Sequence, residues 1–138
     1  MFERILVPLD FSPSAWQALE TARVRFPGAV RTLLYVQPQR LAPPPALELL
    51  GSGARLGGNA QALTELEDQL QERETFALAP GDPVNEILNA VREKDVELIM
   101  MGTHARQGLS HFILGSVAEA VVRRSPVPVL TVRASDQA

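Results

Sequence analysis

Two glycines flank a polar loop in the second half of the chain, and the residues around them have the chemistry to hold an anion. Gly102 ends the apolar run Val96–Met101, and Gly115-Ser116 begins a later amphipathic segment. The first N–H groups of a helix have no acceptor within the helix, and together with the helix dipole they favour an anion. Arg106, in the loop, adds a guanidinium group, which suits phosphate oxygens. The pattern predicts a phosphate cradle at one edge of a sheet.

Each of these residues also has a purely structural explanation. A glycine such as Gly102 or Gly115 can simply end a strand or enter a helix where the backbone needs an unusual φ. Ser116 and Glu119 have the spacing of a capping box. Asp10, which follows another apolar run, can cap the turn into the next helix. The combined spacing of the two glycines favours the phosphate role, whereas the choice for Ser116 stays open.

Other kinds of chemistry lack the residues that they need. The chain has no cysteine, which excludes disulfides, thiol catalysis and cysteine-ligated metals. Lys94 is its only lysine and lies outside any glycine-rich loop, so there is no Walker A motif. No nucleophile elbow and no pairing of carboxylates is visible. His104 and His111 have no recognisable metal-ligand spacing. We therefore expect neither catalytic residues nor metal ligands.

Length and charge narrow the classes of protein further. A chain of 138 residues predicts a single domain, residues 1–138, with a real core. The net charge of −3 does not favour nucleic acid or an acidic membrane as a partner. No apolar run approaches the roughly 18 residues that a membrane span needs. The first residues lack the features of a signal peptide, so we expect a cytoplasmic protein.

Apolar runs alternate with amphipathic segments along the whole chain. The predicted strands are Arg4–Leu9, Val30–Val36, Thr75–Ala79, Val96–Met101 and Val127–Val132. Four helices are predicted. The first begins at Ser12-Pro13, the second spans Gln61–Arg73, and the third begins at Asp82-Pro83. The fourth begins at Ser116, and the apolar stripe that marks it is Leu114, Val117, Ala118, Val121 and Val122. Residues 38–58, rich in proline and glycine, are predicted as a surface excursion over the ligand edge, and residues 134–138 as a loose tail.

This alternation predicts an α/β fold with one open, parallel, five-stranded sheet and helices on both faces. Right-handed crossovers leave few topologies, and we expect the strand order 3-2-1-4-5. Strands 1 and 4 then lie side by side at the switch point, where ligands bind at the carboxyl ends of the strands. Asp10 follows strand 1 and Gly102 follows strand 4, so the two segments are expected to meet.

Three segments of the chain resemble the universal stress protein family. The stretch GTHARQGLSHFILGS, residues 102–116, is similar to the signature G-x2-G-x9-G-[ST] of its nucleotide-binding members, with Ala105 in place of the second glycine. The segments RILVPLDFS (Arg4–Ser12) and SPVPVLTVR (Ser125–Arg133) also resemble that family. The resemblance implies the same Rossmann-like fold that the alternation predicts.

The resemblance also implies a ligand, namely ATP, or ADP or AMP, with Mg²⁺ carried on the phosphates. The residues implied to bind it are Pro8, Leu9, Asp10, Val36, Met101, Gly102, His104, Ala105, Arg106, Gly115, Ser116 and Val117. By the same resemblance, the segment from Pro8 to Asp10 lines the adenosine end and Val36 packs against the adenine. Arg106 is the expected counter-charge to the phosphates. Ala105 is expected to weaken nucleotide binding rather than to abolish it.

Two other functions remain as alternatives, a nucleotide-free dimeric interaction module and a weak ATP-hydrolysing enzyme.

The dimer prediction comes from the last strand, Val127–Val132. Its proline near the start is typical of an edge strand, and it lacks the charges that usually protect an edge. Family members that the chain resembles pair through this strand, so we expect a two-fold homodimer there.

Overall fold

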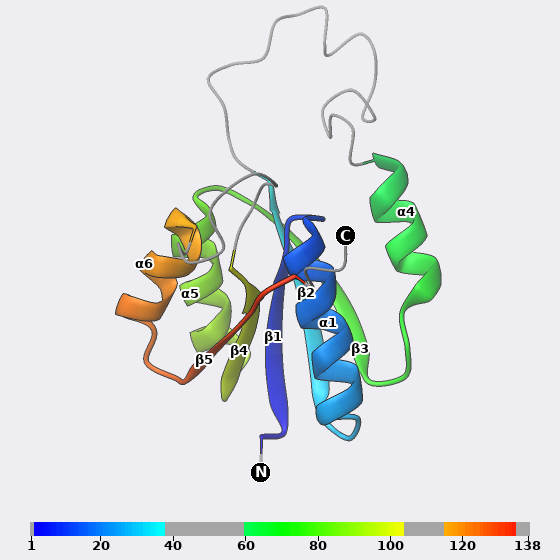
Figure 1. The fold of residues 1–138 in the computed structure, drawn as a ribbon, viewed down its shortest axis with the longest axis horizontal. Helices are drawn as coiled ribbons and strands as arrows, with labels where there is room; N and C mark the ends of the chain where they lie inside the picture. The colour runs from blue at the N-terminus through cyan, green and yellow to red at the C-terminus, as the bar shows by residue number, and fades with distance from the viewer. Residues whose placement is uncertain (1, 38–59, 104–114, 135–138) are drawn as a thin grey trace, which may run out of the picture.

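Five parallel strands form one sheet with helices on both of its faces (Figure 1). The computed structural model describes residues 2–37, 60–103 and 115–134. Its elements are β1 (Arg4–Leu9), α1 (Pro13–Arg25), β2 (Val30–Gln37), α4 (Ala60–Gln69), β3 (Glu74–Pro80), α5 (Pro83–Glu93), β4 (Leu98–Gly102), α6 (Ser116–Arg124) and β5 (Val129–Val132). The strand order is β3-β2-β1-β4-β5, which confirms the predicted order. The predicted excursion over residues 38–58 and the tail from residue 135 lie outside the described residues.

Two apolar clusters, one on each face of the sheet, hold the helices in place. Successive side chains of a strand point to opposite faces, and β1 is buried on both. Ile5, Val7 and Leu9 join the cluster that includes residues of α1 and α4, whereas Leu6 joins the cluster beneath α5 and α6. Among the described residues, no helix is long and apolar enough to cross a membrane.

Two helices begin as the sequence predicts, with a capping side chain followed by proline. The Ser12 hydroxyl accepts a hydrogen bond from the Ala15 amide at 3.3 Å, at the start of α1. The Asp82 carboxylate accepts one from the Asn85 amide at 3.0 Å, at the start of α5. Each cap satisfies one of the N–H groups that the helix leaves without an internal acceptor. The proline at the first helical position needs no such acceptor.

The predicted capping box at α6 is wrong. Ser116 is the first residue inside the helix, and the N-cap is Gly115, which has no side chain to accept a hydrogen bond. The Glu119 amide bonds to the Gly115 carbonyl at 2.9 Å, while the Glu119 carboxylate pairs with Arg123 at 3.2 Å. The apolar stripe is also shorter than predicted, because Val122 is exposed.

Helix α4 ends at Gln69, four residues before the predicted end at Arg73. The backbone of Arg73 has φ 71°, a left-handed conformation that no α-helix continues through. Strand β3 begins immediately afterwards with Glu74, whose side chain is fully buried. The left-handed residue Arg73 therefore separates the end of the helix from the strand, which begins at the buried Glu74.

A buried charge cluster surrounds the Glu74 carboxylate. Arg23 of α1 approaches it at 2.7 Å and Arg31 of β2 at 2.9 Å, and the Gln71 amide donates to it at 3.0 Å. Burial alone raises the pKa of Glu74, but the hydrogen bonds from Arg23, the Gln71 amide and Arg31 outweigh it and lower the pKa to about 2. The cluster joins α1, β2 and β3 at the amino end of the sheet.

Strands β4 and β5 each begin two residues later than predicted. The Val96 amide bonds to the carbonyl of Val91 in α5, so Val96 still belongs to the turn after that helix. The Ser125 hydroxyl bonds both to the amide and to the carbonyl of Val127, which holds Val127 in a turn before β5. In both places a local turn uses the backbone groups that a strand would need.

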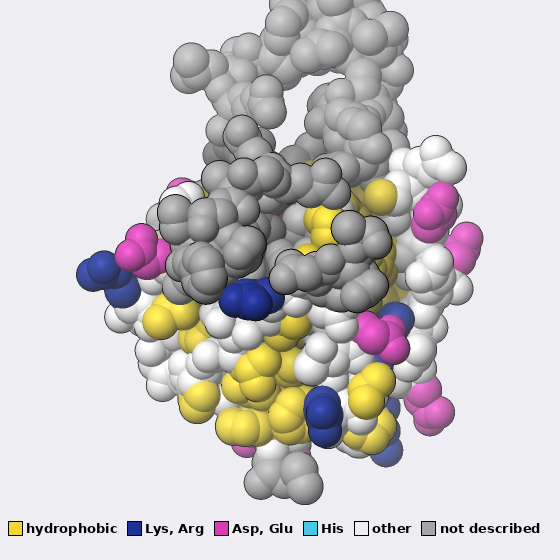
Figure 2. Space-filling model, in the orientation of Figure 1, with side chains coloured by type: hydrophobic (Ala, Val, Ile, Leu, Met, Phe, Trp, Pro, Cys, Tyr) yellow, Lys and Arg dark blue, Asp and Glu magenta, His cyan; other side chains and the backbone are white. Residues whose placement is uncertain are grey.

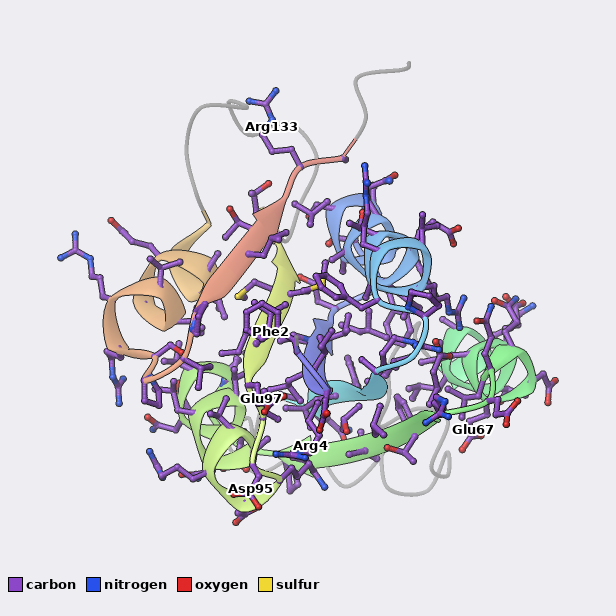
Figure 3. All side chains as sticks on the ribbon, turned by 90° about the horizontal axis from the view of Figure 1, so that it is seen from below. Phe2, Arg4, Glu67, Asp95, Glu97 and Arg133 are labelled. Carbon is purple, nitrogen blue, oxygen red and sulfur yellow. The ribbon has the colours of Figure 1, made fainter. Side chains whose placement is uncertain are left out.

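A second polar cluster ties β1 to the segment before β4 (Figure 3). The Arg4 guanidinium donates to the Asp95 carbonyl at 2.7 Å and lies 3.7 Å from the Glu97 carboxylate. The amides of Glu3 and Arg4 also donate to Glu97, and the bond from Glu3 holds the pKa of Glu97 below its ordinary value. These contacts fix the amino ends of β1 and β4, opposite the carboxyl edge of the sheet.

Candidate functional site

The carboxyl ends of β1 and β4 lie side by side, as predicted. Ile5 pairs with Leu98 and Leu6 with Ile99, so the two strands run in parallel toward the same edge. Asp10 leaves β1 there, and Gly102 is the last residue of β4. The two segments predicted to meet at the switch point therefore do so.

The N-terminus of α6 is held at this edge by the backbone. The Thr103 amide bonds to the Val132 carbonyl at 3.1 Å, which continues the β4–β5 pairing beyond the strand. The Thr103 carbonyl accepts a hydrogen bond from the Gly115 amide at 2.6 Å. Gly115 is the N-cap of α6, and Thr103 directly follows the last residue of β4. This hydrogen bond therefore places the first-turn amides of α6 beside the end of β4. A helix N-terminus in this position is suited to an anion.

A pocket of about 290 Å³ opens at the same edge. The predicted site residues that line it are Pro8, Leu9, Asp10, Val36, Met101, Gly102, Gly115, Ser116 and Val117. The structure thus brings together all nine predicted residues that it describes, from β1, β2, β4 and α6. Predicted residues His104, Ala105 and Arg106 lie outside the described part of the chain.

Part of the pocket wall was not predicted from the sequence. The additional lining residues are Ala15, Leu34, Tyr35, Pro83, Ile87, Thr103 and Ala118. Pro83 and Ile87 come from α5, which packs beside α6 on the same face. The contribution of α5 could have been predicted from the strand order, because a helix that follows a parallel strand begins at the carboxyl edge of the sheet. The contribution of Tyr35 follows from its position directly before the predicted Val36.

The walls of the pocket are mostly apolar, and its polar groups are few. Leu34, Val36, Met101 and Ile87 present aliphatic or thioether surface, the kind of wall on which a planar ring packs. Among the described lining residues, only Asp10 carries a charge. The described residues contain no group of three or more His, Asp or Glu side chains placed to hold a metal ion. The arrangement suits binding of an organic ligand.

Gly102 has a structural requirement that is independent of any ligand. A Cβ at this position would lie 2.6 Å from the Ala15 backbone nitrogen and from the Ser14 carbonyl carbon, and would also overlap Ser14 Oγ. No side chain fits there unless α1 moves. Gly102 therefore allows the first turn of α1 to approach the end of β4.

Gly115 differs from Gly102, because its backbone does not require glycine. Its φ of −65° and ψ of 159° are open to any residue. The explanation that a glycine is needed here for an unusual φ is therefore wrong. Close approach of a ligand to the backbone remains a reason for glycine at this position.

Asp10 forms a turn with its own backbone rather than capping α1. Its Oδ1 accepts a hydrogen bond from the Ser12 amide at 3.0 Å, and Ser12 is the residue that caps the helix. An ionised carboxylate can accept several hydrogen bonds. The exposed Asp10 thus keeps acceptor capacity for a ligand hydroxyl at the pocket wall.

Comparison with known proteins assigns the chain to a family. The model of the universal stress protein family matches residues 1–133. The chain belongs to the universal stress protein family. A universal stress protein of Thermus aquaticus is 32% identical over 142 residues, covering 96% of this chain and 100% of the relative. One of Methanocaldococcus jannaschii is 29% identical over 142 residues, covering 96% of this chain and 83% of the relative.

Solved universal stress proteins share the fold described above. The structure of universal stress protein UspA from Lactobacillus plantarum superposes with a TM-score of 0.77 at 25% identity. The match covers 96% of this chain and 98% of that protein. The Rossmann-like fold predicted from the sequence is therefore confirmed.

Proposed function

We propose that this universal stress protein binds an adenine nucleotide, ATP or a related one, as a regulatory or structural ligand at the carboxyl edge of β1 and β4. The observation that carries the proposal is that all nine described residues predicted to bind nucleotide line one pocket. The apolar wall that includes Val36 receives the adenine, and the Asp10 carboxylate accepts hydrogen bonds from the sugar hydroxyls. The phosphates lie at the N-terminus of α6, with Mg²⁺ carried on their oxygens.

Nucleotides bound to proteins of the same fold support this proposal. A universal stress protein solved in complex with cAMP has a TM-score of 0.66 and 22% identity, covering 97% of this chain and 99% of that one. An Arabidopsis thaliana member solved with AMP has a TM-score of 0.67 and 19% identity, covering 97% and 93%. At these identities the likeness establishes only the fold, so adenine nucleotide binding comes to this chain as a proposal.

The proposal is tested first on unmodified protein. Mass spectrometry of freshly purified protein identifies any nucleotide that it retains, and calorimetric titration compares ATP, ADP, AMP and GTP. We expect saturable binding of adenine nucleotides and weaker binding of GTP. If no nucleotide is retained and none binds, the proposal fails, and the nucleotide-free interaction module becomes the better explanation. Release of phosphate from ATP in a turnover assay would instead favour a weak hydrolase.

A matched pair of substitutions in β2 tests the location of the ligand. Val36→Phe adds a ring at the pocket wall, whereas Val30→Phe adds the same ring at the exposed opposite end of the strand. We expect the Val36 variant to lose at least about tenfold in ATP affinity through overcrowding, and the Val30 variant to bind normally. Normal binding by a folded Val36→Phe protein would move the ligand out of this pocket.

We also propose that two copies pair through β5, as predicted from the sequence. This strand forms one edge of the sheet, Leu130 on it is 38% exposed, and hydrophobic side chains gather on the face over it (Figure 2). Leu78, 49% exposed on the opposite edge strand β3, provides a matched control. We expect light scattering at micromolar concentration to show a dimer that Leu130→Lys dissociates and Leu78→Lys does not. A monomeric unmodified protein would contradict the proposal.

A further inference from the structure

A bulky residue adopts a left-handed backbone conformation beside the pocket. Phe11 has φ 63°, and it lies between Asp10, on the pocket wall, and Ser12, the N-cap of α1. Such a φ is uncommon for any residue with a Cβ and most unusual for a bulky one. The other described non-glycine residues with positive φ are Arg73 and Asp95, in turns that precede β3 and β4. Only Phe11 among them is at the carboxyl edge of the sheet.

Aromatic packing holds this conformation. The Phe11 ring lies 5.2 Å from the Tyr35 ring and 5.8 Å from the Trp16 ring, centroid to centroid, with interplanar angles of 47° and 50°. Both separations lie in the range of favourable aromatic pairs. Tyr35 reaches Phe11 because β2 pairs with β1 in a register that sets Tyr35 beside Leu9. Side chains from α1 (Trp16) and β2 (Tyr35) thus hold the turn at Phe11 in place.

The consequence of this conformation is the geometry of Asp10. Because Phe11 turns the chain back, the Ser12 amide comes within 3.0 Å of Asp10 Oδ1. Rotating Phe11 to a negative φ would redirect that amide and release the carboxylate. Glycine would allow the same φ without steric conflict but would leave the turn free to adopt others. The Phe11 ring therefore restricts the turn to a single conformation, which glycine would not do.

We propose that Phe11 is a positioning residue that, clamped by Tyr35 and Trp16, holds the Asp10 carboxylate in place for a ligand hydroxyl. Strained backbone of this kind persists where the surrounding structure holds it, and it is concentrated at functional sites. For its ligand, the inference rests on the proposed binding of an adenine nucleotide. The positioning itself is a property of the protein without ligand.

The ligand-dependent test is a double-mutant cycle measured by ATP titration. Phe11→Gly keeps the left-handed conformation accessible but removes the ring, and Asp10→Ala removes the carboxylate. We expect Phe11→Gly to weaken ATP binding about five- to tenfold, and to cost nothing further when Asp10 is already alanine. The control variant Phe11→Tyr, which keeps the ring, should bind ATP with an affinity within about twofold of that of the unmodified protein. Equal losses from Phe11→Gly with and without the Asp10 carboxylate would overturn the proposal.

A second readout needs no nucleotide and separates the two proposals. The NMR shift of the Ser12 amide follows protonation of the Asp10 carboxylate as long as their hydrogen bond persists. We expect acid titration to move this resonance in the unmodified protein and to move it less than half as far in Phe11→Gly. An unchanged Ser12 response would overturn the positioning role even if ATP binds, whereas a reduced response in a protein that binds no ATP would refute only the nucleotide. If the glycine variant does not fold, Phe11→Asn, which tolerates the left-handed conformation, replaces it.

Discussion

Replacing Gly115 by aspartate would place a carboxylate at the N-cap of α6, where the proposed phosphates lie. The backbone accepts the change, because the φ of −65° and ψ of 159° are typical of N-cap residues with side chains. Aspartate caps a helix slightly better than glycine, and its charge complements the helix dipole. The free energy of unfolding should therefore rise by roughly 0.3–1 kcal/mol.

Nucleotide affinity should change in the opposite direction. Two unit charges roughly 5 Å apart interact by about 3 kcal/mol at an effective dielectric constant of 20 and by about 1 kcal/mol in water. Repulsion of the phosphates should thus weaken ATP binding about 5- to 150-fold. Gly115→Asn is the matched control, because asparagine has the same shape and caps equally well but carries no charge. The control isolates the charge from the bulk of the added side chain.

Calorimetric titration of both variants with ATP, at low and at high salt, completes the experiment. We expect the Asp variant to bind more weakly than the Asn variant, and the difference to shrink as salt screens the repulsion. If both folded variants bind ATP as tightly as the unmodified protein does, no phosphate lies at the N-terminus of α6. An equal loss in both would mean that the bulk of the side chain, and not its charge, excludes the ligand.

Three further predictions concern the loop, the charge cluster and the packing of α1. Ala105→Gly should tighten ATP binding about five- to thirtyfold in a titration, if alanine there crowds or strains the phosphate loop; no gain would mean that this residue does not limit the site. Because the folded pKa of Glu74 is about 2, below the unfolded value, its stabilisation is present above about pH 4.5 and is lost as pH falls toward 2. Urea unfolding should show this loss of stability, at most about 3 kcal/mol. The variant Glu74→Gln should already be less stable at pH 7, because Arg31 loses its buried counter-charge, and its stability should not show this acid-dependent loss. Gly102→Ala should lower the free energy of unfolding by about 1–3 kcal/mol through overcrowding against α1, whereas Gly28→Ala, with no atom within 4 Å of the added methyl, should not; equal effects would contradict the packing argument.

The parts of the structure that sequence predicts well are those decided by local chemistry. Ser12 and Asp82 each precede a proline and cap a helix, and neither position depends on distant residues. The alternation of strands and helices, with the rules for crossovers, is enough to bring β1 beside β4. Most of the pocket follows from that adjacency, because Asp10 and Gly102 are simply the ends of those two strands.

Two of the errors lie where distant contacts overrule the local pattern. The helical pattern runs on to Arg73, but Glu74 begins β3, where its buried side chain bonds to Arg23, 51 residues away. The capping-box spacing of Ser116 is overruled because the amide before it bonds to Thr103 at the end of β4. Such partners leave no periodicity for a sequence pattern to detect.

The turn at Phe11 illustrates the same limit at the site itself. Neither its left-handed conformation nor its contact with Tyr35 has a signal in the neighbouring residues. Both depend on the register of β2 against β1, which a strand assignment alone does not give. The positions of the site residues could thus be predicted, but not what orients them.

The central place of β1 has a consequence for biosynthesis. Strand β1 leaves the ribosome before β4, so the edge of β1 that pairs with β4 stays unpaired until β4 is made; the hydrogen bond from Glu3 to Glu97 spans 94 residues. At about 5–20 residues per second, that edge stays open for roughly 5–20 s. An unpaired apolar strand is a site of aggregation during this time. The proposed nucleotide cannot shorten the interval, because its site needs α6, which is made after β4.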